Sequence, residues 1–240
     1  YDAYQLGLGA PKYLRLLNMH ELYRQAWGHV AAEQNGEKTS VKLLPPLLGM
    51  LKTQYLIAGY SEQGLDRAFS DDERPPEALL QFNAYRVQSY RQGNNIIEAI
   101  ARIEPNIAQT QVMLGDWSLW NGRSKDAWQA YRRAETELAG EDDAQVQLQK
   151  VFSQPIALPD IPGLAQLPPA VDTKEADIVL EFTVDKKGRV QDLERLDDNE
   201  ESAKQAKQLM KQVRKTIFRP RFTNGQPQET EKMVKAFNVQ

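Results

Sequence analysis

The sequence contains no cysteine and only two histidines, His20 and His29. Without cysteine, disulfides, thiolate metal ligands and thiol nucleophiles are excluded. The same absence does not identify a compartment, because a cysteine-free chain suits a reducing cytoplasm and an oxidising periplasm equally well.

Long hydrophobic runs are also missing. The longest, Leu43–Leu51, has nine residues and includes two prolines and a glycine, whereas a membrane-spanning helix needs about 20. The chain begins at Tyr1 rather than at Met, which leaves open a signal or membrane anchor upstream of it.

Neither sign of charge dominates. Thirty Lys and Arg residues oppose 33 Asp and Glu residues, which gives 240 residues a net charge of −3. This balance predicts no general attraction to nucleic acid or to acidic membranes.

No motif for catalysis or cofactor binding is complete. His20 begins a pattern like that of a zinc-protease helix, but Arg24 stands where the second His would be. Residues 7–12 place glycines before a lysine without nucleotide-loop spacing, and Pro11 removes an amide that such a loop would use. We expect His20 and His29 to be ordinary helix residues, and predict a non-enzyme with no catalytic residue, metal ligand or cofactor.

The composition changes sharply near two thirds of the chain. Residues 1–166 hold 16 of the 20 aromatics and a net charge of −4, whereas 167–240 hold four Phe and a net charge of +1. Five of the 13 prolines lie close together at this change, and proline favours an extended, semi-rigid connector. We predict a helical domain at 1–153, an apolar, proline-rich linker at 154–170 and a second domain at 171–240.

Before the linker, apolar residues recur with the spacing of helices. Asn, Gly, Asp and Pro predict breaks between these helices at four places: 35–36, 71–76, 92–95 and 121–122. The segments between the breaks suit helices joined by short loops.

One stretch of the first domain has small residues where two helices would cross. Gly115 falls in the first helix, Gly122 in the turn, and Ala127 and Ala134 in the second helix. This pattern resembles one tetratricopeptide repeat, at about residues 108–141. Since a single repeat cannot bury its own face, the rest of the domain is expected to consist of divergent repeats or other packed helices.

Four large aromatics lie in this repeat: Trp117, Trp120, Trp128 and Tyr131. We expect each of them to pack between helices, because large aromatics dominate protein cores. The alternative is that they line a concave groove for a peptide or partner protein.

After the linker, apolar and polar residues alternate, which predicts strands with one buried face. Turn residues at 185–188 and 224–225 and an amphipathic segment complete the pattern. The predicted order is strand 178–184, strand 190–196, helix 200–218 and strand 230–239. The fold class is therefore a two-domain protein, α followed by α+β, whose second domain is a small β-β-α-β antiparallel sheet covered by one helix.

Several spaced motifs of this second part carry a family resemblance. They are Phe182-Thr183-Val184-Asp185-Lys186-Lys187-Gly188-Arg189-Val190, Phe218-Arg219-Pro220, Asn224-Gly225-Gln226-Pro227 and the closing Phe237. Residues 167–240 resemble the C-terminal domain of TonB-family energy transducers from Gram-negative bacteria.

The resemblance implies a periplasmic location and a peptide-binding sheet edge. In that family the last strand pairs with a short peptide of an outer-membrane transporter by β-strand addition. Carried over to this chain, the edge consists of Glu231, Lys232, Met233, Val234, Lys235, Ala236, Phe237, Asn238 and Val239. The family also implies inner-membrane motor proteins as partners and a membrane anchor in the full-length protein.

Four lysines fall on the side of the predicted helix opposite its apolar stripe: Lys204, Lys207, Lys211 and Lys215. A solvated helix face is the reading we favour, because surface helices are normally charged opposite their apolar side. The alternative is electrostatic docking onto an acidic partner.

Two functional hypotheses follow. The first is a non-enzymatic periplasmic interaction protein, in which the second domain binds a transporter peptide and the helical domain binds another partner. The second is a cell-envelope scaffold or assembly protein, in which the TonB-like domain is a structural module or forms a homodimer through its open edge.

Overall fold

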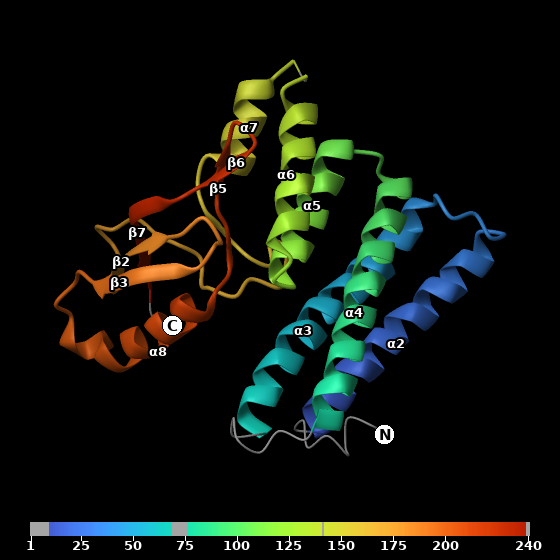
Figure 1. Ribbon diagram of the computed structural model, residues 1–240, viewed down its shortest axis with the longest axis horizontal. Coiled ribbons are helices and arrows are strands. Elements are labelled where there is room, and N and C mark those ends of the chain that lie inside the picture. Colours follow the sequence, from blue (N-terminus) through green and yellow to red (C-terminus); the bar gives the residue numbers. More distant parts are fainter. Residues whose placement is uncertain (1–9, 69–75, 141, 239–240) are drawn as a thin grey trace. The chain divides into compact units, whose positions relative to one another are not determined.

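The computed structural model describes residues 10–68, 76–140 and 142–238, and Figure 1 shows its helices and strands. The architecture is mixed, with helices and small antiparallel sheets, which agrees with the predicted combination of α and α+β structure. Contacts between Cα atoms divide the chain into two compact units, Tyr1–Trp117 and Ser118–Gln240. The segment predicted as a linker, 154–170, lies inside the second unit.

The first unit is helical. Its elements are α2 (Ala10–Glu33), the short 3-10 helix η1 (Val41–Leu43), α3 (Leu44–Ala68), α4 (Pro76–Ile103) and most of α5 (Ile107–Trp120). Helix α3 contacts both α2 and α4. The predicted break at 35–36 is confirmed, since Asn35 and Gly36 both take positive φ values, 53° and 80°. The break predicted at 71–76 lies mostly outside the described residues.

The break predicted at 92–95 is wrong, because α4 continues through it. Gly93 is a packing site: a Cβ atom placed on it would come within 2.3 Å of the Trp117 indole. The indole nitrogen donates a hydrogen bond of 3.0 Å to the Tyr90 carbonyl, and the Tyr55 ring meets the indole edge-on, with ring centroids 4.8 Å apart. A glycine that suggested a loop thus admits a large aromatic against the helix, and Trp117 is fully buried, as expected for a packing residue.

A polar network joins α2, α3 and α4. Gln54 is 1% exposed; its amide nitrogen lies 3.2 Å from His20 Nε2 and 2.8 Å from Gln92 Oε1. Its amide oxygen accepts a 2.7 Å hydrogen bond from the Ser89 hydroxyl. Thr53 completes the network, with its hydroxyl 2.8 Å from His20 Nδ1. The side chains of this network are therefore paired across three helices.

The network assigns the proton on His20. The Thr53 hydroxyl donates to the Met50 carbonyl at 2.7 Å, so its oxygen accepts from His20 Nδ1–H. Nε2 is then the acceptor for the Gln54 amide, which requires a neutral ring. Burial lowers the pKa of His20 below its usual value, in agreement with this geometry.

No helix within the described ranges is both long and apolar enough to cross a membrane.

The second unit contains the end of α5 and two further helices before its strands, α6 (Ser124–Leu138) and α7 (Ala144–Phe152). The helix–turn–helix predicted around residue 122 is present, and Gly122 takes a φ of 71°. Three strands form the main sheet, in the order β3 (Val190–Arg195), β2 (Ile178–Val184) and β7 (Thr230–Phe237). Two smaller antiparallel pairs join β1 (Ile156–Ala157) to β4 (Phe218–Arg219) and β5 (Arg221–Thr223) to β6 (Gln226–Gln228).

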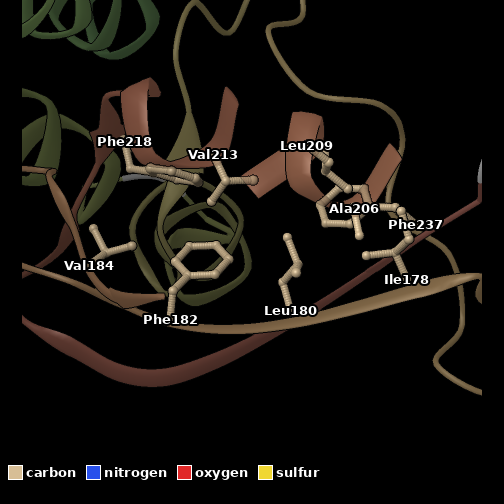
Figure 2. Close-up of a cluster of buried hydrophobic side chains, with 9 residues drawn as sticks. All are labelled: Ile178, Leu180, Phe182, Val184, Ala206, Leu209, Val213, Phe218 and Phe237. Carbon is tan, nitrogen blue, oxygen red and sulfur yellow. The ribbon is translucent and has the colours of Figure 1, made fainter. Parts of the chain in front are cut away.

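Strand β2 lies in the middle of the main sheet and supplies its core face. The alternation read from the sequence is confirmed, because Ile178, Leu180, Phe182 and Val184 are each at most 2% exposed. Figure 2 shows these side chains pointing toward Ala206, Leu209 and Val213 of helix α8 (Ala203–Lys215). Helix α8 thus covers one face of the sheet.

The helix is shorter than predicted. It follows a short 3-10 turn, η2 (Glu200–Ser202), and ends at Lys215 rather than at residue 218. Thr216 is already extended (φ −73°, ψ 133°), and Phe218 pairs with Ala157 of β1. The pairing partner comes from the proline-rich segment, so a tertiary contact ends the helix.

The turn between β2 and β3 depends on Gly188, which takes a φ of 77°. Asp185 organises this turn, since its Oδ1 accepts hydrogen bonds of 2.8 Å from the amides of Lys187 and Arg189. A Cβ atom on Gly188 would lie 1.9 Å from the Phe218 carbonyl oxygen. Positive φ and backbone contact together make this glycine irreplaceable.

Candidate functional site

Strand β7 is an edge strand of the main sheet. It pairs with β2 in antiparallel register along one side, with Met233 opposite Phe182 and Phe237 opposite Ile178. Among the described residues, its other side carries a single β-bridge, between Val171 and Ala236. The backbone from Thr230 to Lys235 therefore presents an edge that no strand of the described chain covers.

The bridge shows which backbone groups point outward. Val171 N–H donates a 2.9 Å hydrogen bond to the Ala236 carbonyl, so Ala236 faces the open side. Backbone groups alternate between the two sides of a strand, and Val234 consequently faces the same open side. Val234 is also 43% exposed, so both its backbone and its side chain are accessible.

A β-bulge limits this edge at its start. Glu231 and Lys232 together oppose the single residue Thr183 on β2, and Lys232 takes a φ of 50°. On the other side of β2, Asp192 of β3 forms a matching bulge with the same φ. Bulges of this kind increase local twist and discourage unintended edge pairing.

The structure gives the predicted edge residues different environments. Glu231, Lys232 and Val234 are exposed, Met233 and Lys235 are half-buried, and Ala236 and Phe237 are buried in the core. Asn238 is exposed. Val239 lies outside the described residues. The accessible part of the edge is therefore centred on Val234.

The four lysines of the predicted docking face are exposed on α8: Lys204, Lys207, Lys211 and Lys215. In the described ranges, no carboxylate lies within ion-pair distance of any of them. The face opposite packs on the sheet through Ala206, Leu209 and Val213. Exposure of these lysines suits a solvated face and a docking face alike.

An aromatic cluster joins α6 and α7 to the strands. Phe222 of β5 lies 5.6 Å from both Tyr131 and Phe152, measured between ring centroids, and 6.3 Å from Trp128. Tyr131, Phe152 and Phe222 are at most 2% exposed. The packing expected of Tyr131 between helices is therefore confirmed, since its ring meets Phe152 of α7 edge-on. It also contacts Phe222 of the β5–β6 hairpin, which Figure 1 shows beside α6 and α7.

Glu135 holds the tip of this hairpin. Its two carboxylate oxygens accept hydrogen bonds from the amides of Asn224 and Gly225, at 2.8 and 2.7 Å. Asn224 and Gly225 both take positive φ values, as the predicted two-residue turn requires. Arg132 adds a 3.4 Å hydrogen bond to the Gly225 carbonyl. Helix α6 is thus attached to the sheet-bearing part of the unit by charge-assisted bonds.

A cavity of about 660 Å³ opens beside strand β7. Its walls come from the end of α7, from β1, from residues 165–170 and from β7. Phe218 and Phe237 form part of its floor, and Lys150 and Lys235 also line it. We call this cavity the α7–β7 groove.

A buried arginine borders the α7–β7 groove. Arg219 is 2% exposed; its guanidinium donates to the Val151 carbonyl at 3.2 Å and to Asp160 Oδ2 at 3.1 Å. Asp160 is the carboxylate among the groove-lining residues. Since Arg219 already balances that charge, the two lysines leave the groove positive.

A second charge cluster lies between β3 and α8. Asp197 accepts hydrogen bonds from the Arg195 guanidinium and, at 2.7 Å, from the amide of Val179. Arg195 also reaches the Ser202 hydroxyl at 2.9 Å. The hydrogen bond from Arg195 lowers the pKa of Asp197 to about 2, which keeps the carboxylate of this ion pair ionised at neutral pH.

Sequence reasoning identified the edge but not the α7–β7 groove. Lys150, Phe218 and Lys235 come from three separate parts of the chain, and no local pattern connects them. The one feature of the sequence that pointed to the groove was the apolar character of the proline-rich segment 154–170, because apolar side chains there were expected to pack against another part of the protein.

No protein-family model, curated protein or solved structure matches this chain significantly.

Proposed function

We propose that this protein is a non-enzymatic, periplasmic interaction protein of the Gram-negative cell envelope. Its second unit binds an extended peptide of another envelope protein by β-strand addition to β7. By the TonB resemblance, that peptide belongs to an outer-membrane transporter, and the protein contributes to energy transduction. The tetratricopeptide-like helices bind a separate partner, such as an inner-membrane motor protein.

The uncovered edge of β7 is the observation that carries this proposal. β-strand addition requires outward-pointing backbone groups and side chains that tolerate a neighbour. Val234 supplies both, because its backbone faces the open side and its residue is 43% exposed, whereas the outward carbonyl of Ala236 already accepts a hydrogen bond from Val171. The order β2, β3, α8, β7 with one covering helix agrees with what the resemblance implies.

A titration of the whole chain with a peptide of transporter type tests the proposal. Backbone amide shifts are expected to concentrate on residues 231–236, and a Val234→Pro variant is expected to lose binding because proline cannot donate to a ladder. Val146→Thr is the control, because Val146 is an exposed valine of α7 that belongs neither to β7 nor to the residues lining the groove. Shifts confined to the α8 lysines, or full binding by Val234→Pro, would overturn the proposal.

The second candidate is an envelope scaffold in which the same edge pairs with another copy of the chain. The exposed Val234 favours it, because an uncovered edge strand is a template for pairing with another chain. Light scattering distinguishes the candidates: a concentration-dependent dimer that Val234→Pro dissociates supports the scaffold. A monomer at every concentration refutes it.

A further inference from the structure

We propose that the α7–β7 groove is a specificity site that receives the side chains of a peptide paired with β7, and that it selects peptides carrying a carboxylate among apolar residues. This inference rests on the function proposed above. It assigns a chemical class to the ligand, which the open edge by itself does not define.

The groove is continuous with the edge. Lys235 lies between Val234 and Ala236, the two residues whose backbone groups face outward, and its own side chain lines the groove. Lys235 also opposes Leu180 of β2, so both side chains project to the sheet face that α8 covers. A strand added outside β7 would place every second side chain on that same face. Those side chains are the ones that reach the groove.

The floor of the groove is apolar. Ile156 and Leu167 line the groove and are half-buried, so they offer apolar surface to a ligand. Phe218 and Phe237 also line it but are at most 2% exposed. Apolar side chains of a bound peptide would gain by leaving water here. A peptide in which apolar and polar residues alternate would place its apolar side chains on the groove side, because successive side chains of a strand point to opposite faces.

The charges around the groove define the remaining selectivity. Lys235 is half-buried and Lys150 is exposed at the end of α7. Asp160, the lining carboxylate, already accepts from the buried Arg219. A carboxylate of the peptide would therefore meet two cations with one compensated acid, whereas a peptide lysine would meet like charges.

Residues 165–170 form the remaining wall and end at the Val171 bridge to Ala236. This segment stops a bound strand from extending along β7 beyond Ala236 without displacing Val171. The groove therefore contacts a short stretch of the peptide, centred on the peptide residue that lies beside Lys235.

A matched set of peptides tests the inference. Each peptide is capped at both ends and alternates Thr with Val over seven residues, and its central residue, on the valine side, is Glu, Gln or Lys. Binding to the chain of residues 1–240 is measured by calorimetry. We expect the Glu peptide to bind about three- to tenfold more tightly than the Lys peptide at low salt, with Gln between them. Near 0.5 M salt the difference is expected to shrink.

Charge reversal in the groove identifies the residues responsible. Lys235→Glu is expected to reverse the order of the Glu and Lys peptides, and Lys150→Glu, on an exposed helix position, is expected to reduce the difference. Lys204→Glu on α8 is the matched control, since the same change outside the groove is expected to leave the order unaltered. Circular dichroism confirms that each variant is folded.

Failure of this inference differs from failure of the proposed function. If all three peptides bind with equal affinity, and Val234→Pro weakens all of them, the groove does not select and the edge proposal stands. If Lys204→Glu reverses the order as strongly as Lys235→Glu, the selectivity lies on α8. If no peptide binds, both the edge and the groove proposals are overturned.

Discussion

Replacing Gln54 by Leu is expected to destabilise the first unit strongly. Leucine has nearly the volume of glutamine, so the change removes hydrogen bonds without opening a large cavity. Gln54 is 1% exposed and makes three hydrogen bonds, to His20, Gln92 and Ser89. The substitution therefore isolates the contribution of the network.

The magnitude follows from which partners can find water. Ser89 is 6% exposed, so its hydroxyl is left unpaired at a cost of about 1–3 kcal/mol. His20 and Gln92 are more accessible, and each loses a net hydrogen bond of about 0.5–1.5 kcal/mol. Part of the sum is recovered by burying an apolar side chain, which leaves a loss of roughly 2–4 kcal/mol.

Hydrogen exchange followed by mass spectrometry reads this loss in the first unit alone. Peptides from 44–59 and 87–103 are expected to exchange faster in the variant, while those from 178–184 remain unchanged. Gln109→Leu, at an exposed position of α5, is the matched control. A loss below about 0.5 kcal/mol in these peptides would show that the network does not stabilise the helices.

Four further predictions concern single residues. Because burial lowers the pKa of His20, the neutral ring contributes stability that is complete above about pH 6.5 and is lost as pH falls through the lowered pKa of the folded state. The free energy of unfolding of the first unit, measured in urea, is therefore expected to fall from pH 7.5 to pH 5, and a His20→Gln variant should lose this pH dependence. Asp197→Asn is expected to cost about 1–2 kcal/mol at pH 7 in chemical unfolding, and the difference from the parent should vanish as pH falls from about 4 toward 2, since the pKa of Asp197 is about 2. Glu135→Gln keeps one acceptor oxygen and is expected to destabilise the β5–β6 hairpin by about 1–2 kcal/mol. The amides of Asn224 and Gly225 should then exchange faster, whereas the matched variant Glu137→Gln should leave their exchange rates unchanged. Gly188→Ala is expected to cost at least about 3 kcal/mol, measured as a fall in thermal midpoint beside the neutral control Gly140→Ala, whose new Cβ would lie 3.4 Å from its nearest neighbour.

Local patterns predicted the parts of the fold that depend on nearby residues. The alternation in β2 depends on one buried face, and the turns at Gly188 and Asn224 depend on positive φ values that few residues adopt. Prediction failed where a distant residue decided the outcome. Gly93 remains helical because Trp117 packs on it, and the chain leaves α8 early because Phe218 pairs with β1.

The candidate site divides in the same way. The edge on β7 could be proposed from the motifs of one contiguous segment, although the bulge at Lys232 and the bridge to Val171 could not. The α7–β7 groove required segments from before and after the sheet to meet. Its positive charge further depends on Arg219 compensating Asp160, a pairing across 59 positions that spacing does not reveal.

The attachment of the hairpin to α6 has a consequence for synthesis on the ribosome. Glu135 and Asn224 are separated by 89 positions, and at roughly 5–20 residues per second the hairpin is made about 5–20 s after α6. During that interval Tyr131 and Phe152 have no Phe222 to cover them. The emerging helices therefore expose an apolar surface until the hairpin has been made, which makes chains that stop before residue 222 prone to aggregate or to require a chaperone.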